Sequence, residues 1–154
     1  MTARQSKLLP AVEPRWTTAI RDVAASFQPR VVELACQIAA VPAPTNDERE
    51  RSQFVAALMR DEGVADVDVD DLGDVVGRIA GRQRSPGLLL AAHLDTVFPR
   101  STSLDVVRSN GRAAGPGIGD NSLGVASVLL LSHMLRALEL TPAVDVLVIG
   151  NVGE

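Results

Sequence analysis

Apolar and polar residues recur along this chain with two periods, which predict helices and strands in turn. Residues 29–40 carry apolar side chains at positions 31, 32, 34, 35, 38 and 39, the spacing of one helix face. Residues 49–63 continue with a second helical pattern. Thr45 and Glu48 form the T-x-x-E pattern of a capping box before that helix, and Gly63 is placed to end it.

Strand patterns follow the second helix. Residues 64–71 alternate strictly between valine and aspartate, which predicts a strand with one solvated face, antiparallel or at an edge. Residues 75–81 are a second strand after a short turn. Residues 87–92, GLLLAA, do not alternate, so we expect an interior strand that is covered on both faces.

The remaining elements complete an α/β pattern. Asn110-Gly111 is the strongest hairpin signal in the chain. Residues 121–140 are apolar on most sides and predict a buried helix of about five turns. Residues 143–154 resemble another interior strand. Helices that alternate with interior strands indicate a layered α/β domain.

Length and composition narrow the class of protein. The 154 residues are enough for one domain, and we divide them into an N-terminal arm of uncertain order, 1–28, and the domain proper, 29–154. A net charge of −4 gives no footprint for nucleic acid. The single Cys36 suits a reducing compartment. With no secretory signal and no membrane-length apolar run, we expect a cytoplasmic protein without a membrane or nucleic-acid partner.

Candidate chemistry lies where three apolar elements end. His93 and Asp95 follow the strand at 87–92, Asp120 lies between a glycine-rich stretch and the buried helix, and Glu154 follows the last strand. Functional groups of open α/β sheets gather beyond the carboxyl ends of strands. We therefore expect these side chains to converge in one crevice.

Each of these residues has a structural and a functional interpretation. His93 and Asp95 point to the same side of a strand, so the carboxylate can orient the ring of a metal ligand or simply bond it. Asp120 can bridge two metal ions or cap the helix. Glu154 can act as a general base or be a solvated terminal residue. The glycine-rich stretch lacks the third glycine of a dinucleotide fingerprint, and a G-x-S-x-G elbow and a Walker loop are both missing from the sequence.

Together, the segments AAHLDTVFP, GPGIGDNSLG and GNVGE resemble the co-catalytic zinc metallopeptidases of the peptidase T and glutamate carboxypeptidase kind. That family includes acetylornithine deacetylase, succinyl-diaminopimelate desuccinylase and aminoacylase. The separations, 27 residues from His93 to Asp120 and 34 from there to Glu154, agree with it. The resemblance covers residues 29–154. It implies a three-layer α/β/α domain with a mixed, mainly parallel sheet, of which this chain is the front part.

The resemblance also implies roles for these residues. His93 would ligate one of two zinc ions, with Asp95 orienting its ring. Asp120 would bridge both ions, and its bond to Asn121 is commonly cis in this family. Glu154 would be the general base, the first glutamate of a G-E-E motif. Cobalt or manganese suits the same ligands.

The implied function is metal-dependent hydrolysis of peptide bonds by an exopeptidase. The segments HLDTVFP and GPGIGDN are closer to the sequences of the family's peptidase branch. The segment DNSLG, however, lacks the Lys or Arg that often follows the bridging aspartate. The alternative within the family is a deacylase of N-acyl amino acids. His133 lies inside the predicted helix, where a structural histidine is expected rather than a ligand.

The sequence carries two inner ligands, His93 and Asp120, which are fewer than a dinuclear zinc site needs. We therefore expect the 154-residue chain to be inactive by itself. A hypothesis from another class is a non-catalytic interaction module that retains half of the fold. An exposed apolar face would then favour a homo-oligomer or association with the missing C-terminal part.

Overall fold

The computed structural model describes residues 13–153, so Glu154 and the first twelve residues lie outside the described part. Its helices are α1 (Pro14–Ala39), α2 (Arg49–Asp61), α3 (Leu123–Leu129) and α4 (Leu131–Ala137), with a short π-helical segment, η1 (Ile118–Ser122). Its strands are β1 (Ala65–Val69), β2 (Val75–Ile79), β3 (Gln83–His93), β4 (Val107–Ser109), β5 (Arg112–Ala114) and β6 (Val144–Asn151).

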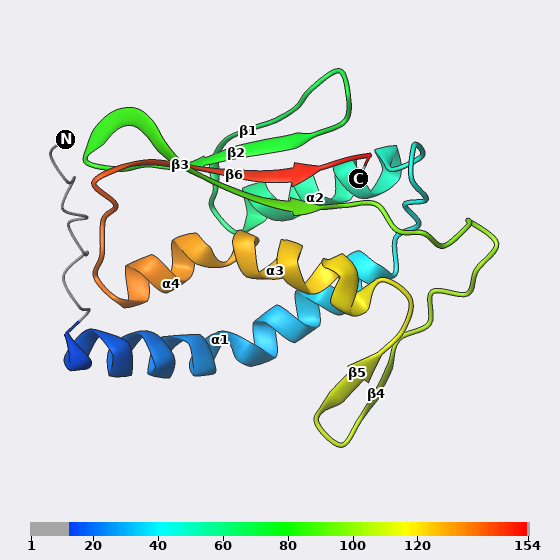
Figure 1. Cartoon of the computed structure of the whole chain (residues 1–154), viewed down its shortest axis with the longest axis horizontal. Coiled ribbons are helices and arrows are strands. Elements are labelled where there is room, and N and C mark those ends of the chain that lie inside the picture. Colours follow the sequence, from blue (N-terminus) through cyan, green and yellow to red (C-terminus); the bar gives the residue numbers. More distant parts are fainter. Residues whose placement is uncertain (1–12, 154) are drawn as a thin grey trace, which may run out of the picture.

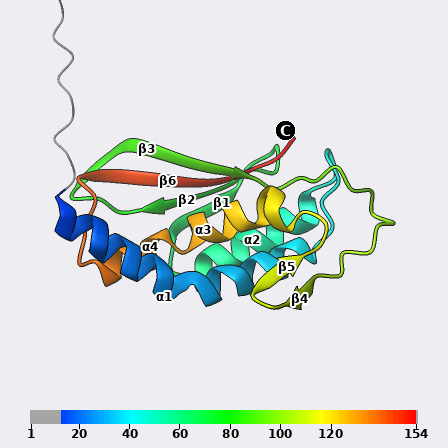
Figure 2. The same ribbon diagram turned by 60° about the horizontal axis from the view of Figure 1, so that its bottom comes forward.

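Four strands form one mixed sheet in the order β1-β2-β6-β3. β3 and β6 run parallel, whereas β2 is antiparallel to both β6 and β1. The helices lie together on one face of this sheet (Figures 1 and 2). The β4-β5 pair forms a separate hairpin at the Asn110-Gly111 turn, where both residues have a positive φ. The predicted hairpin is therefore confirmed.

The core lies between the sheet and the helices. Its most deeply buried apolar side chains come from α1, α2, α3, β2, β6 and the segment after β3, and include Leu34, Ile38, Val55, Met59, Val75, Leu94, Leu129 and Val148. α1 packs against α3 and η1, so it supports the segment that carries Asp120.

The α/β class with a mixed sheet is confirmed. Within residues 13–153, however, one of the three strand pairs in this sheet is parallel, and the helices form a single layer rather than two. The sheet is mixed because a short turn joins β1 to β2 as an antiparallel hairpin, whereas the long connection from β3 to β6 contains η1, α3 and α4 and returns β6 parallel to β3.

The prediction that residues 87–92 form an interior strand covered on both faces is wrong. β3 lies at the edge of the sheet, and Leu88 and Leu89 are 51% and 55% exposed. An apolar run without alternation shows that both faces of a strand are apolar, but it does not place the strand inside a sheet. Among the described residues, the second neighbour of β3 and the cover of its outer face are both absent.

Two helical predictions also change. α1 runs through residue 28, with Pro29 inside it, so the boundary expected there falls within one helix. The helix expected over residues 121–140 is broken at Leu130, where the axis bends by 45°. The Ser127 hydroxyl donates to the Leu123 carbonyl at 2.8 Å, a contact that commonly bends helices.

Within the described part, a single helix long and apolar enough to cross a membrane is not found. The bent pair Ile118–Leu129 and Leu131–Ala137 passes that test by length and composition only.

Candidate metal centre

The site begins where β3 and β6 end side by side. Their parallel register pairs His93 with Asn151, and Leu94 N–H donates to the Asn151 carbonyl at 2.7 Å. The two strands therefore bring two different chain segments together at their carboxyl ends, as the sequence predicted. Val152 and Gly153 continue from β6 at this edge, and Glu154, which would follow them, lies outside the described residues.

His93 and Asp120 meet in space although 27 residues separate them. Nε2 of His93 lies 2.9 Å from Oδ1 of Asp120, whose side chain is 92% exposed. Asp120 lies in η1, which follows Gly117 with its positive φ of 68°. A Cβ at Gly117 would come within 2.8 Å of the Thr96 methyl group, so this turn requires glycine. The peptide bond between Asp120 and Asn121 is cis, as the resemblance implied.

Asp95 lies on the other side of the same ring. Its Oδ1 is 3.4 Å from His93 Nδ1, and its side chain is buried, with 4% of the residue exposed. The Thr45 hydroxyl donates to Asp95 Oδ2 at 2.8 Å. The two oxygens of this carboxylate therefore face different partners.

The imidazole of His93 lies between two carboxylates, Asp95 at Nδ1 and Asp120 at Nε2. A neutral imidazole carries one N–H and can donate to one of them only. When Asp95 accepts that hydrogen, Nε2 presents a lone pair towards Asp120, and a cation between these two atoms satisfies both. Imidazole nitrogen and carboxylate oxygen are zinc ligands, so the two side chains fit a zinc ion.

A complete metal site needs more donors than these. In residues 13–153, no group of three or more His, Cys, Asp or Glu side chains is arranged to hold a metal ion. His133, the other histidine, pairs instead with Glu62 through Nε2 at 3.1 Å and packs near the Phe27 ring. Its expected structural role is confirmed.

A buried arginine supports the segment that joins His93 to Asp95. Arg51 of α2 is 1% exposed and donates from Nη1 to the Leu94 carbonyl at 2.7 Å and from Nε to the Val41 carbonyl at 2.9 Å. Burial lowers the pKa of its guanidinium to about 10, and the nearby Asp95 carboxylate opposes this shift. Arg51 was not among the residues predicted from the sequence, although a charge on the apolar face of a predicted helix is a usable signal.

The predicted capping box is wrong, and the side chains of both residues bond to other partners. The helix cap is Glu48, which makes no side-chain capping bond, and α2 starts at Arg49. Thr45 bonds Asp95, as described above, while the buried Glu48 carboxylate accepts the N–H groups of Asn46 at 2.8 Å and Gly153 at 3.2 Å. Two long-range contacts outcompete the local capping pattern.

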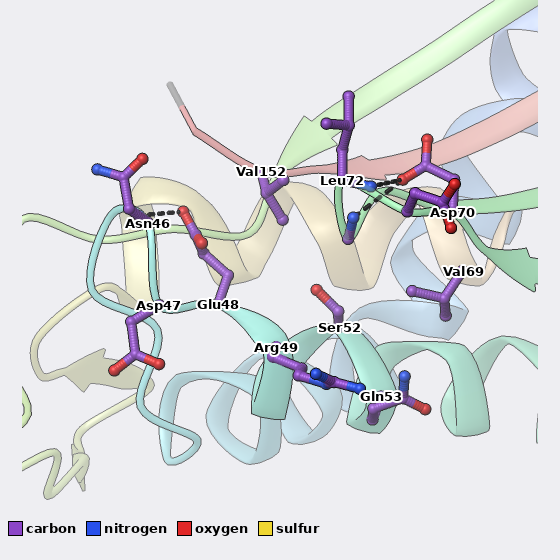
Figure 3. A pocket seen from close by; sticks show the side chains of 12 residues that line it. Asn46, Asp47, Glu48, Arg49, Ser52, Gln53, Val69, Asp70, Leu72 and Val152 are labelled. Atoms are coloured by element: carbon purple, nitrogen blue, oxygen red, sulfur yellow. Dashed lines mark hydrogen bonds between the residues drawn. The ribbon is translucent and has the colours of Figure 1, made fainter.

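Two cavities are lined by residues of the loop 45–48, which precedes α2. One, of about 620 Å³, opens at the candidate centre and is lined by Thr45, His93, Asp95, Phe98 and Asp120, among others. The other has the same volume and lies between the start of α2 and the β1–β2 turn (Figure 3). There the Asp70 carboxylate accepts the N–H groups of Leu72 and Gly73, and Asn46 bonds Glu48.

The sequence matches one family model over residues 74–154, slightly more than half of the chain, and that model describes peptidase family M28. The matched residues include β3, η1 and β6, which together build the site. No curated protein matches the chain.

Solved structures match the fold. Aminopeptidase PepT from Bacillus cereus is 22% identical, with a TM-score of 0.69 over 82% of this chain and 37% of its own. A tripeptidase from Staphylococcus aureus is 21% identical, with a TM-score of 0.64 over 81% and 36%. A dinuclear metal-binding peptidase of the M20 family from Bacillus subtilis is 18% identical, with a TM-score of 0.59 over 84% and 36%. This chain therefore spans little more than a third of each.

Proposed function

The chain belongs to peptidase family M28, and on this basis we propose that it carries part of the active site of a metal-dependent exopeptidase. The observation that carries the proposal is the approach of His93 Nε2 to Asp120 Oδ1, at 2.9 Å, from two segments that are distant in sequence. Zinc is the metal that this donor pair suits, and cobalt or manganese are the alternatives.

The roles follow from the contacts of each side chain. His93 would bind one zinc ion through Nε2, because the Asp95 carboxylate, 3.4 Å from Nδ1, would accept a hydrogen there and so fix the tautomer. Asp120 would bind through Oδ1, and its exposed second oxygen would reach a second ion. When bound, zinc supplies a Lewis acid that polarises a carbonyl and lowers the pKa of water. We assign Glu154 the role of general base, which accepts a proton and returns it to the leaving amine.

Peptides are the substrates we propose. The solved neighbours carry the names aminopeptidase, tripeptidase and peptidase, which favours a peptide over an N-acyl amino acid. Hydrolysis of N-acyl amino acids is the alternative at the same metal centre, because both substrates present an amide carbonyl.

We further propose that the 154-residue chain binds zinc weakly and does not hydrolyse peptides by itself, since its described residues offer two inner ligands. A non-catalytic interaction module is the competing function. The exposed Leu88 and Leu89 of edge strand β3 favour association, with another copy or with the remainder of a longer protein.

The first test is zinc affinity, measured by competition with a chromophoric chelator. We expect His93→Ala and Asp120→Ala each to weaken binding about tenfold or more, and His133→Asn to leave it unchanged. Equal affinity in the wild-type chain and His93→Ala would overturn the metal site.

The second test adds a tripeptide or an N-acetyl amino acid to the zinc-loaded chain. We expect no turnover of either. Turnover that His93→Ala abolishes would overturn the expected inactivity while supporting the metal site, and the preferred substrate would separate peptidase from deacylase.

A further inference from the structure

We propose that Thr45 is a positioning residue of the metal centre: its hydroxyl holds the Asp95 carboxylate in the orientation that presents the other oxygen to His93. The inference deepens the proposed function and rests on it, because it assumes that His93 is a ligand. The sequence pattern assigned Thr45 to a helix cap, and the structure gives its hydroxyl a different partner.

The contacts form a relay from Thr45 to the ring. Oγ1 of Thr45 donates to Oδ2 of Asp95 at 2.8 Å, and Oδ1 of Asp95 faces Nδ1 of His93 at 3.4 Å. The two oxygens belong to one planar group, so rotation of the carboxylate that breaks one contact also misdirects the other. Thr45 therefore acts on His93 through Asp95.

The hydroxyl is delivered by fixed backbone. Thr45 N–H donates to the Thr96 carbonyl at 3.3 Å, and Thr96 N–H donates to the Ala43 carbonyl at 2.8 Å. Pro44 and Thr96 form a parallel bridge, so residues 43–45 run beside the segment that follows β3. Because the loop and the Asp95 segment share these bonds, the Thr45 hydroxyl and the carboxylate keep their relative position.

Arg51 bonds the backbone next to both Thr45 and Asp95. Its guanidinium donates to the Val41 carbonyl, in the stretch that leads to Thr45, and to the Leu94 carbonyl, next to Asp95. One buried side chain thus ties the donor segment to the acceptor segment. These bonds fix the position of Thr45 relative to Asp95.

Burial makes the orientation of Asp95 matter. With 4% of the residue exposed, its carboxylate meets little bulk water that would replace a lost donor. Without the hydroxyl, Oδ2 loses a bond and the carboxylate turns towards other donors. The Nδ1–H of His93 is then held less firmly, and a smaller fraction of rings presents the Nε2 lone pair to a metal.

The test compares Thr45→Val, which removes the hydroxyl at nearly constant shape, with Thr45→Ser, which retains it. Thr17→Val, in the first turn of α1, is the matched control. Zinc affinity is measured by chelator competition on the 154-residue chain. The ¹⁵N shifts of the imidazole are measured without zinc at one fixed alkaline pH. The chain has two histidines, so His133→Asn assigns the signals.

We expect Thr45→Val to weaken zinc binding about three- to tenfold, below the effect of losing a direct orienter, and to move the His93 ring shifts towards a mixture of tautomers. Thr45→Ser should restore both values, and Thr17→Val should match the wild type. Circular dichroism confirms that each variant is folded.

Two results would overturn the inference. One is a Thr45→Val chain with wild-type ring shifts and zinc affinity. The other is equal weakening by Val and Ser, which would assign the effect to packing. If the wild-type chain binds zinc no better than His93→Ala, the proposed function fails instead, while the metal-free ring shifts still decide whether Thr45 orients His93.

Discussion

Arg51 donates to the carbonyl oxygen of Leu94 at 2.7 Å, so a buried guanidinium bonds the backbone of the one residue between His93 and Asp95. Only the backbone of Leu94 accepts this bond, while its side chain is fully buried in the core. The contact joins the stability of the domain to the geometry of the candidate centre.

Replacing Arg51 should therefore destabilise the fold. We expect Arg51→Met to lower the free energy of unfolding by about 3–5 kcal/mol, because the buried Leu94 carbonyl and the partly buried Val41 carbonyl lose their donor. Arg51→Lys should recover little of it, since one ammonium cannot reproduce the planar fork. Urea denaturation measures both. Arg49→Lys, at an exposed position of the same helix, is the control, and an Arg51→Met chain as stable as that control would contradict the prediction.

Arg100 should set the titration of Asp47. The guanidinium bonds the Asp47 carboxylate and Glu50, and its bonds to Asp47 hold the pKa of that carboxyl below the usual 3.8. A lowered folded-state pKa stabilises the fold above the unfolded value, and this contribution is lost as the pH falls through the folded value. We expect Arg100→Gln to raise the Asp47 pKa towards 3.8, as measured by carboxyl ¹³C NMR. Arg108→Gln should leave it unchanged, and an Asp47 pKa that is the same with and without Arg100 would refute the pairing.

Gly124 should resist replacement although it lies in a helix. Alanine normally stabilises a helix interior by about 1 kcal/mol relative to glycine. Here a Cβ would lie 2.1 Å from Oδ1 of Asn121, so the Asn121 side chain, next to Asp120 in the chain, must shift. We expect Gly124→Ala to lower the free energy of unfolding by about 1–3 kcal/mol and to weaken zinc binding. Gly119→Ala, where a Cβ meets no atom within 4 Å, is the control for thermal denaturation.

Glu48 should protect the backbone that follows β6. Its carboxylate accepts the Gly153 N–H at 3.2 Å, and Val152 N–H is held by Asp74 at 2.8 Å. We expect hydrogen exchange of the Gly153 amide, measured by NMR, to accelerate severalfold in Glu48→Ala. Glu48→Gln retains an acceptor oxygen and should accelerate it less. Equal exchange in Glu48→Ala and in the exposed control Glu50→Ala would show that the bond does not protect the amide.

Local periodicity predicted much of the fold. It located α2, the antiparallel edge strand β1, β2, the hairpin and the interior strand β6, because each of these carries its signal within a few residues. The H-x-D spacing likewise placed His93 and Asp95 on one side, where their side chains meet.

Tertiary contacts account for what the sequence did not reveal. The position of β3 depends on which strands stand beside it, and its own residues do not encode that. Thr45 matches the local pattern of a helix cap, but its hydroxyl donates to Asp95, fifty positions away in the chain. The strand ends predicted that Asp120 and His93 converge, but the position of Asp120 before a helix is equally typical of a cap, so its role as a metal ligand required the resemblance.

The parallel register that pairs His93 with Asn151 has a consequence for assembly. Side chains of a strand alternate between faces, so sliding β3 by one residue along β6 would turn His93 to the opposite surface. Its partner Asp120 comes from η1 and would not follow. Under the proposed function, zinc uptake would therefore discriminate between correctly and incorrectly aligned strands, and a metal titration would also measure the fraction of molecules that have folded in register.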